Sequence, residues 1–475
     1  MRRSEVSTAP LDDAGSPAGP LGPFAYEGGR LTHEGSPISG IAERFGTPVY
    51  LYSAAGIRRS AGAFREAFAR FTPEIHFAAK ACGNVRILSL LVGAGLGIDA
   101  VSGGEVERAW LAGCPMHRIA FAGVGKSEAE IAAAIDGGYS PLRGTDLPDR
   151  FGLPDPVDRG PVGLINVESE AELARVDRIA RDLSVRVRVA LRVNPDIDAR
   201  THPYTTTGRK HNKFGIDLGE AEKLYRRAAR AADGTGGADP IGLHVHIGSP
   251  VYEPEPFAEA ALAIARSASR LREVGCRVEV LDMGGGWPSA YRPEQARDLD
   301  AFANAIGEPL APEIERGTEI HFEPGRSIIA TNGLLLTSVE YVKATAERRF
   351  IICDAGMQTL LRPSLYESFH AIWPVDSGCG PFDGSSDCES PPADIVGPIC
   401  ETGDFIARDR PFPRVAAGEL LAVFGAGAYG MSMASTYNQH PRPAEVLLDG
   451  DRAVLIRPRE SIADLIGPET VVADA

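Results

Sequence analysis

Apolar runs of strand length alternate with amphipathic helical stretches along most of this chain, and this alternation constrains the fold more than any other feature. Eight such runs lie at 75–80, 96–102, 119–125, 162–169, 185–195, 242–249, 278–286 and 319–327. The stretches between them, such as 257–274, are long enough for a helix that crosses back over a parallel sheet. Since open parallel sheets usually have about five to seven strands, eight units predict a closed (β/α)8 barrel over residues 55–335.

The pattern changes after residue 335, where short β-type runs are separated by turn residues. These runs lie at 334–341, 349–353, 393–396, 420–424, 444–448 and 453–456. They predict an all-β domain, a sandwich or barrel, over residues 336–475, so the fold class is α/β plus all-β. We expect the segment 23–54, with a strand at 47–53, to pack with this domain.

Three further segments lack hydrophobic periodicity. Residues 1–22 are rich in Ser, Ala, Gly and Pro, which is typical of a disordered tail. Segments 139–160 and 376–392 are expected to be inserted loops.

The composition excludes several classes of partner. The 475 residues carry a net charge of −15, which argues against a nucleic acid or an anionic membrane as partner. No apolar run reaches the roughly 18 residues that a membrane span needs, and the start lacks the apolar core of a signal peptide. Seven cysteines without C-x-x-C spacing fit a reducing compartment better than a disulfide framework. We therefore expect a cytoplasmic protein.

A lysine ends the first barrel strand, where the reactive residues of such barrels lie. Lys80 follows the apolar residues Phe-Ala-Ala. It can simply extend its ammonium group to the barrel rim. Alternatively, burial lowers the pKa of an amine and makes it a nucleophile for an aldehyde, as a Schiff-base lysine requires.

Three other strand ends carry candidate residues. Gly284, Gly285 and Gly286 form a turn that admits a phosphate, although a simple tight turn explains them equally well. Glu323 and Arg326 can form an ion pair with each other. Alternatively, Glu323 faces a cationic ring nitrogen and Arg326 faces a substrate carboxylate. His244 and His246 alternate along a strand and no acidic partner is expected nearby, so we expect no zinc site and no other metal.

Long motifs in the same order resemble the diaminopimelate decarboxylase family over about residues 23–468. In the barrel they are HFAAKA (76–81), INVESEAEL (165–173), GLHVHIGS (242–249), LDMGGG (281–286) and FEPGRSI (322–328). In the second domain they include DAGMQTLLRPSLYESFH (354–370), VGPICETGDFIA (396–407) and GAGAYGMSMASTYNQHPRPAEVL (425–447). The resemblance implies an enzyme that uses pyridoxal phosphate on a small amino-acid substrate.

The resemblance also implies roles for individual residues. Lys80 corresponds to the Schiff-base lysine, His246 to the imidazole stacked on the cofactor ring and Glu323 to the acid that holds the ring nitrogen protonated. The remaining residues implied to bind the cofactor, mostly at its phosphate, are Ser249, Gly285, Gly286, Gly325, Arg326 and Tyr429. Cys400 corresponds to the catalytic proton donor. With Glu401 it enters the neighbouring subunit's site, so a homodimer with shared active sites is implied.

The implied substrate is meso-diaminopimelate, decarboxylated at its D centre to L-lysine in the last step of lysine biosynthesis. Its distal end would contact Arg326, Arg362, Tyr366, Glu401 and Tyr429. Ornithine or lysine would leave buried guanidinium groups unpaired, at a cost of several kcal/mol.

Three alternatives remain open at this point. Pro250, GGGWPSAY (284–291), Cys353 and the 376–392 insertion depart from the family pattern, which leaves room for a paralogue of specialised metabolism with a modified or carrier-tethered substrate. A racemase would need a second base opposite Lys80. A non-catalytic homologue that binds pyridoxal phosphate would usually lack Lys80 or Cys400.

Overall fold

The computed structural model describes residues 19–137, 142, 145–151, 159–200, 202, 207–208, 212–232, 237–345, 348–383 and 392–470. The chain forms two compact units. Among the described residues, the first unit comprises 61–288 and 297–326, and the second comprises 19–60, 289–296 and 327–470.

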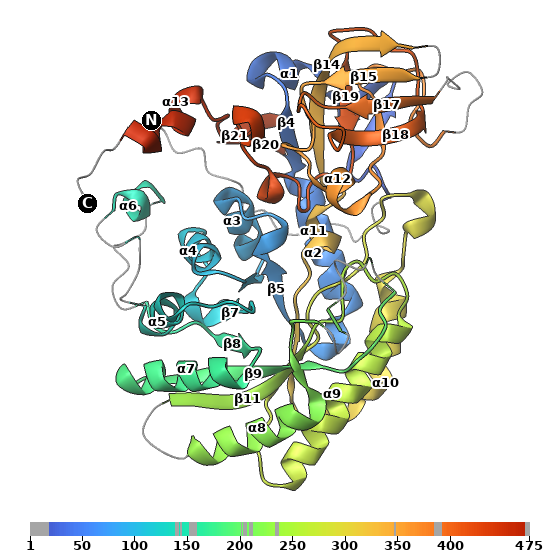
Figure 1. Ribbon diagram of the computed structural model, residues 1–475. Coiled ribbons are helices and arrows are strands. Elements are labelled where there is room, and N and C mark those ends of the chain that lie inside the picture. Colours follow the sequence, from blue (N-terminus) through green and yellow to red (C-terminus); the bar gives the residue numbers. More distant parts are fainter. Residues whose placement is uncertain are drawn as a thin grey trace. The chain divides into compact units, whose positions relative to one another are not determined.

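The first unit is a closed barrel of parallel strands, as the sequence predicts (Figure 1). Its eight strands among the described residues are β5 (Glu74–Ala78), β6 (Gly97–Ala100), β7 (Ile119–Phe121), β8 (Leu164–Val167), β9 (Arg186–Asn194), β11 (Gly237–Val245), β12 (Val280–Asp282) and β13 (Glu319–Phe322). Pairing of β13 with β5 and of β8 with β9 closes the ring. The two-residue strand β10 (Ile216–Asp217) adds to β9.

Helices connect successive barrel strands. They are α2 (Ala54–Ala67), which precedes β5, then α3 (Val85–Gly93), α4 (Gly103–Leu111), α5 (Glu128–Asp136), α7 (Glu170–Asp182), α8 (Leu218–Ala231), α9 (Glu255–Glu273) and α10 (Leu299–Glu315). Helix α7 illustrates how the sequence sets them. The Ser169 side chain caps its first turn by accepting from the Glu172 N–H, and Leu173, Val176 and Ile179 are buried at helical spacing.

A cluster of aromatic rings anchors the helices of the first unit around Trp287. The indole stacks on Phe257 of α9, with centroids 4.1 Å apart, and meets Phe64 of α2 and Phe322 of β13 edge-on, both at 5.5 Å. Trp287 is 1% exposed, and its indole N–H donates to the Gly284 carbonyl over 3.0 Å. The tryptophan that departs from the family pattern therefore ties the glycine turn to the hydrophobic core.

The second unit is built on the long strand β14 (Gly333–Ala344), which pairs with β4 (Val49–Ser53), β15 (Arg349–Cys353) and β19 (Leu420–Val423). Strand β4 also pairs in parallel with β20 (Ala444–Asp449). The remaining strands of this sheet are β16 (Ile372–Pro374), β17 (Pro392–Val396), β18 (Phe405–Pro411) and β21 (Arg452–Arg457). Three short strands, β1 (Phe24–Glu27), β2 (Arg30–His33) and β3 (Ser36–Pro37), form a separate small sheet.

Short helical segments complete the described chain. The α-helices are α1 (Ser39–Phe45), α6 (Leu147–Phe151), α11 (Arg326–Ile329), α12 (Arg362–Tyr366) and α13 (Ile462–Ile466). The 3-10 segments are Ala69–Phe71, Ala79–Ala81, Met116–Arg118, Pro293–Gln295, Met431–Met433, Tyr437–Gln439 and Gly467–Thr470.

Two predictions from the sequence need correction, and two concern residues outside the described part of the chain. Segment 139–160 is not purely a loop, because it contains α6. Cys379 is disulfide-bonded, so the expectation of reduced cysteines is wrong at this position. Residues 1–18 of the predicted tail and 384–391 of the second insertion lie outside the described residues. Within the described chain, no helix is long and apolar enough to cross a membrane.

Candidate active site

Lys80 lies where the sequence predicts, directly after β5 at the carboxyl end of the barrel strands. Its Nζ is 3.0 Å from Oδ2 of Asp99, the third residue of β6. The lysine side chain is 33% exposed while that of Asp99 is fully buried. Burial and the nearby Glu323 raise the pKa of Asp99 more than Lys80 lowers it. Asp99 is therefore a competent acceptor for the proton that an amine must lose before it attacks an aldehyde.

Glu323 follows β13, is 2% exposed and is held on both oxygens. Its Oε1 accepts from the Asn166 side-chain amide over 3.2 Å, and its Oε2 lies 3.2 Å from Nε2 of His244. Burial opposes ionisation of Glu323, yet His244 first and Lys80 second hold its pKa below the usual range. The carboxylate is therefore fixed in place and charged.

The neighbouring Asp282 has the opposite tendency. Burial first, and the charge of Glu323 second, raise the pKa of Asp282 well above its ordinary value. Donor oxygens of Asp282 and Glu323 lie within 4.8 Å of each other. Two buried carboxyl groups at this separation do not both ionise, so the negative charge stays on Glu323. A buried anion of this kind suits the protonated nitrogen of a pyridine ring.

One part of the sequence reasoning on the histidines was wrong. His244 does have acidic neighbours: donor atoms of His244, Asp282 and Glu323 lie within 4.8 Å of one another, a set that suits a metal ion. Strand β11 ends at Val245, so strict alternation does not extend to His246. We assign this set to the support of Glu323, because His244 is hydrogen-bonded to that carboxylate.

His246 is held as a neutral ring. Its Nδ1 accepts from the Gly285 N–H over 3.0 Å, and burial, followed by Arg192 and Lys80, lowers its pKa well below the ordinary value. Gly285 is required here, because a Cβ on it would lie 2.6 Å from the Glu323 carbonyl oxygen. A neutral imidazole presents a flat face to an aromatic ring without adding charge.

The other predicted cofactor residues of the first unit lie at neighbouring strand ends. Arg326 is 7% exposed, and its Nε lies 3.3 Å from Oγ of Ser249. Gly286 has φ +99°, and a Cβ on Gly325 would lie 3.0 Å from the Cβ atoms of Ala78 and Ala81. These glycines let the backbone approach a bound group closely, as a phosphate site requires.

The second unit holds the other predicted residues. Arg362 begins α12, is 5% exposed and donates through Nη1 to Nε2 of His370 over 2.9 Å. Tyr366 ends α12 and is half-buried, as is Tyr429, which adopts a left-handed conformation with φ +57°.

Cys400 and Glu401 are exposed residues of the second unit. The Cys400 Sγ accepts from the Asn438 side-chain amide over 3.1 Å, and the Tyr437 hydroxyl donates to Glu401 over 2.9 Å. This contact with Glu401 raises the pKa of Tyr437. The segment 437–438 therefore fixes both side chains that the sequence singles out.

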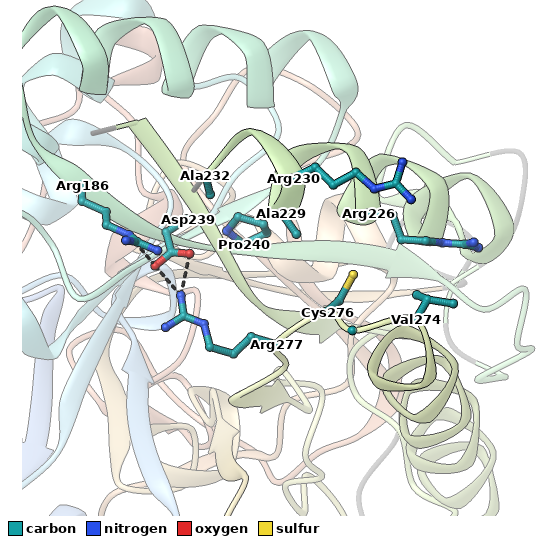
Figure 2. A pocket seen from close by; sticks show the side chains of 11 residues that line it. Arg186, Arg226, Ala229, Arg230, Ala232, Asp239, Pro240, Val274, Cys276 and Arg277 are labelled. Carbon is teal, nitrogen blue, oxygen red and sulfur yellow. Dashed lines mark hydrogen bonds and ion pairs between the residues drawn. The ribbon is translucent and has the colours of Figure 1, made fainter. Parts of the chain in front are cut away.

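A separate pocket of about 380 Å³ lies at the amino end of β9 and β11, away from these strand ends (Figure 2). Figure 2 shows Asp239 between Arg186 and Arg277, and its Oδ2 is 2.9 Å and 2.6 Å from their guanidinium groups. Since the chemistry of such barrels occurs at the carboxyl ends of the strands, we give this pocket no role in the reaction.

Comparison with known proteins identifies the family. The chain is 41% identical over 452 residues to diaminopimelate decarboxylase of Pseudomonas aeruginosa. This match covers 94% of the chain and 99% of the relative. The chain belongs to the diaminopimelate decarboxylase family. Residues 54–330 match the model of the pyridoxal-dependent decarboxylase, pyridoxal binding domain.

Solved structures of this family agree with the fold. Diaminopimelate decarboxylase of Helicobacter pylori complexed with L-lysine has a TM-score of 0.78 and 37% identity, covering 90% of this chain and 98% of that one. The enzyme of M. jannaschii in co-complex with L-lysine has a TM-score of 0.82 and 32% identity, covering 96% and 99%.

The cofactor of the family is pyridoxal phosphate, and the first unit fits it. The strand ends offer a primary amine for its aldehyde, a buried carboxylate for its ring nitrogen, a neutral imidazole and a glycine-lined turn. Asp99 Oδ1 and Asn166 Oδ1 are buried here without a hydrogen-bond partner in the described structure, which indicates a place made for a polar group. The protein is a pyridoxal-phosphate-dependent carboxy-lyase.

The sequence reasoning missed three supporting residues. The sequence alone gives Asp99 and Asn166 no role, and it presents His244 only as a possible metal ligand. All three lie on barrel strands at or next to the carboxyl end. Their positions alone are a sufficient signal, since side chains there converge on one site whatever their separation in sequence.

Proposed function

We propose that this protein decarboxylates meso-diaminopimelate at its D centre, giving L-lysine and carbon dioxide as the last step of lysine biosynthesis in the cytoplasm. The observation that carries the proposal is the fixed, charged Glu323 beside Lys80 in a chain of this family. Solved relatives with bound L-lysine, the expected product, support the same assignment.

The barrel residues prepare the site for the loss of the carboxylate. Pyridoxal phosphate, when bound, draws into its ring the electron pair that the departing carboxylate leaves on the α-carbon. Glu323 would face the ring nitrogen of this group with its negative charge, and the contacts with His244 and Asn166 hold the carboxylate in place. The Lys80 amine would hold the cofactor through its aldehyde, and Asp99 would accept the proton of that amine.

The product needs one proton on the carbon that has lost its carboxylate. We assign this proton to Sγ of Cys400, whose thiol lies on the exposed surface of the second unit and is oriented by Asn438. An exposed thiol serves a buried site when a second subunit covers it. The proposal therefore includes a homodimer in which Cys400 and Glu401 complete the partner's site.

Charge selects the substrate in this proposal. Arg362 is buried, and with Arg326, Tyr366 and Tyr429 it would hold the distal carboxylate, while Glu401 would accept the distal ammonium group. A substrate without a distal carboxylate would not make the charged hydrogen bonds to these guanidinium groups, which are worth about 1.5–3 kcal/mol.

The test is a comparison of kcat/KM for meso-diaminopimelate, L-lysine and L-ornithine with cofactor-loaded enzyme. We expect turnover of the first and at least about 100-fold lower kcat/KM for the other two. Equal values would refute the charge argument. Turnover of none of them, with bound cofactor, would favour the paralogue with a modified or carrier-tethered substrate, whereas racemised diaminopimelate would indicate a racemase.

A further inference from the structure

His370 is a buried histidine that the proposed reaction does not use. It lies between α12 (Arg362–Tyr366) and β16 (Ile372–Pro374) and is 0% exposed. Each nitrogen of its ring has a partner at 2.9 Å: Nδ1 faces the backbone carbonyl of Phe424, and Nε2 faces Nη1 of Arg362.

These two contacts determine the protonation of the ring. A carbonyl oxygen only accepts a hydrogen bond, so Nδ1 carries the proton. A guanidinium group only donates, so Nε2 must present its lone pair. Both contacts are satisfied only by the neutral imidazole with its proton on Nδ1, and the Phe424 carbonyl therefore sets the tautomer that accepts from Arg362.

The chemistry of this acceptor has a consequence for Arg362. A carboxylate in the place of His370 would orient the guanidinium but would also compete with an anionic ligand for its charge. A neutral imidazole orients the same group and adds no negative charge. We propose that His370 is a positioning residue that aims Arg362 at the distal carboxylate of the substrate without adding a negative charge of its own.

Neighbouring groups hold both partners in this geometry. The Tyr291 ring meets the imidazole edge-on, with centroids 5.5 Å apart at 82°, and the Arg362 guanidinium lies 5.0 Å from the centre of the same ring. Gly425, at φ +67°, leaves room for that tyrosine, because a Cβ there would lie 3.0 Å from its Cδ1 atom.

The backbone of His370 is fixed as well. Its carbonyl accepts from Nη1 of Arg410 over 3.0 Å. The preceding ring, Phe369, has the guanidinium groups of Arg410 and Arg292 at 4.2 Å and 3.7 Å from its centre. The imidazole is therefore anchored through its side chain, its carbonyl and its neighbour in sequence, as a group that sets the direction of another must be.

The inference rests on the proposed function, because it assigns Arg362 to a carboxylate. Its specific consequence concerns ligands that differ only in that group. L-lysine carries the carboxylate that Arg362 would bind, whereas cadaverine (1,5-diaminopentane) is the same molecule without it. Loss of the His370 acceptor should therefore weaken binding of L-lysine and leave binding of cadaverine unchanged.

The experiment compares His370→Asn with His370→Gln in the cofactor-loaded enzyme. An asparagine amide reaches the position of Nδ1 and can still donate to the Phe424 carbonyl, but it is too short to accept from Arg362. A glutamine oxygen reaches the position of Nε2. We expect H370N to raise the Kd of L-lysine and the KM of meso-diaminopimelate about tenfold or more, with a smaller change in kcat, and H370Q to restore both.

Other outcomes distinguish failure of the role of His370 from failure of the proposed function. Equal effects of the two variants, or an equal loss of cadaverine binding, would overturn the role of His370. If Arg362→Ala also binds L-lysine normally, the assignment of Arg362 itself fails. His33→Asn is the control for loss of a buried imidazole in the same unit, since His33 contacts Ser53 instead.

A further test uses the wild-type protein and requires no variant. Imidazole ¹⁵N chemical shifts of the wild-type holoenzyme should show His370 neutral with its proton on Nδ1. A doubly protonated ring, or a proton on Nε2, would overturn the inference, because neither form accepts a hydrogen bond from Arg362.

Discussion

Among the barrel residues, the position of one negative charge matters most. Three buried carboxyl groups, Asp99, Asp282 and Glu323, interact with one another, and burial alone would favour the neutral form of each. Contacts with His244 and Asn166 keep the charge on Glu323 rather than on Asp282, while the ion pair with Lys80 favours the ionised form of Asp99. Lys80 and Glu323 were recognisable in the sequence, but their supporting residues come from four other strands whose side chains only the closed barrel brings together.

Cys400 provides a direct test of a single residue. Replacing it with alanine removes the proposed proton donor and leaves Lys80 and Glu323 unchanged, so we expect kcat to fall about 10²–10⁴-fold while the absorbance of the bound cofactor persists. Steady-state kinetics and a visible spectrum of the variant measure both quantities. Unchanged turnover would remove the role of Cys400, and loss of the cofactor spectrum would show that the variant perturbs more than a proton.

His76 should make the stability of the protein depend on pH. Burial, followed by His321, lowers its pKa to about 3, whereas an unfolded histidine titrates near its ordinary value of 6.5. Between these values the unfolded state binds the extra proton, so this residue lowers the free energy of unfolding as the pH falls. We expect His76→Leu to reduce that loss by about 1 kcal/mol between pH 6 and pH 5. Urea unfolding at the two pH values measures it, and parallel wild-type and variant values would contradict the shift.

At the scale of elements, the eight barrel strands were predictable because each is a short apolar run followed by a helix of the correct length. Strands β16 and β18 were missed, since Ile372–Pro374 is too short to show a pattern and Phe405–Pro411 carries charged residues along half its length. The helix α6 interrupts a segment whose glycines and prolines predict a loop. In these places tertiary contacts, rather than local composition, decide the structure.

Trp287 offers a prediction at this scale, because it links the glycine turn to the aromatic core. Trp287→Phe keeps an aromatic ring but removes the hydrogen bond to the Gly284 carbonyl. We expect the Kd of pyridoxal phosphate for the apoenzyme to rise about three- to tenfold as the turn loosens. Trp373→Phe is the matched control, since its indole bonds to the Cys379 carbonyl in the other unit. Equal cofactor affinities in both variants would show that Trp287 only fills space.

For the whole molecule, the proposal of shared active sites separates Lys80 from Cys400 on different subunits. Lys80→Ala and Cys400→Ala should each be nearly inactive alone. If the two variants are unfolded, mixed and refolded together, half of the dimers are hybrids with one intact site, and activity should return to about a quarter of the wild-type value. Enzyme assays of the mixture measure this. No recovery, with dimers present, would contradict shared sites, and mixing each variant with itself is the control.

The central claim concerns the reaction, and the product formed from meso-diaminopimelate tests it most directly. Purified enzyme loaded with pyridoxal phosphate should release one carbon dioxide for each L-lysine formed, with no D-lysine, as measured by gas evolution and chiral chromatography. Carbon dioxide without L-lysine, or no turnover by an enzyme that has bound its cofactor, would contradict the account.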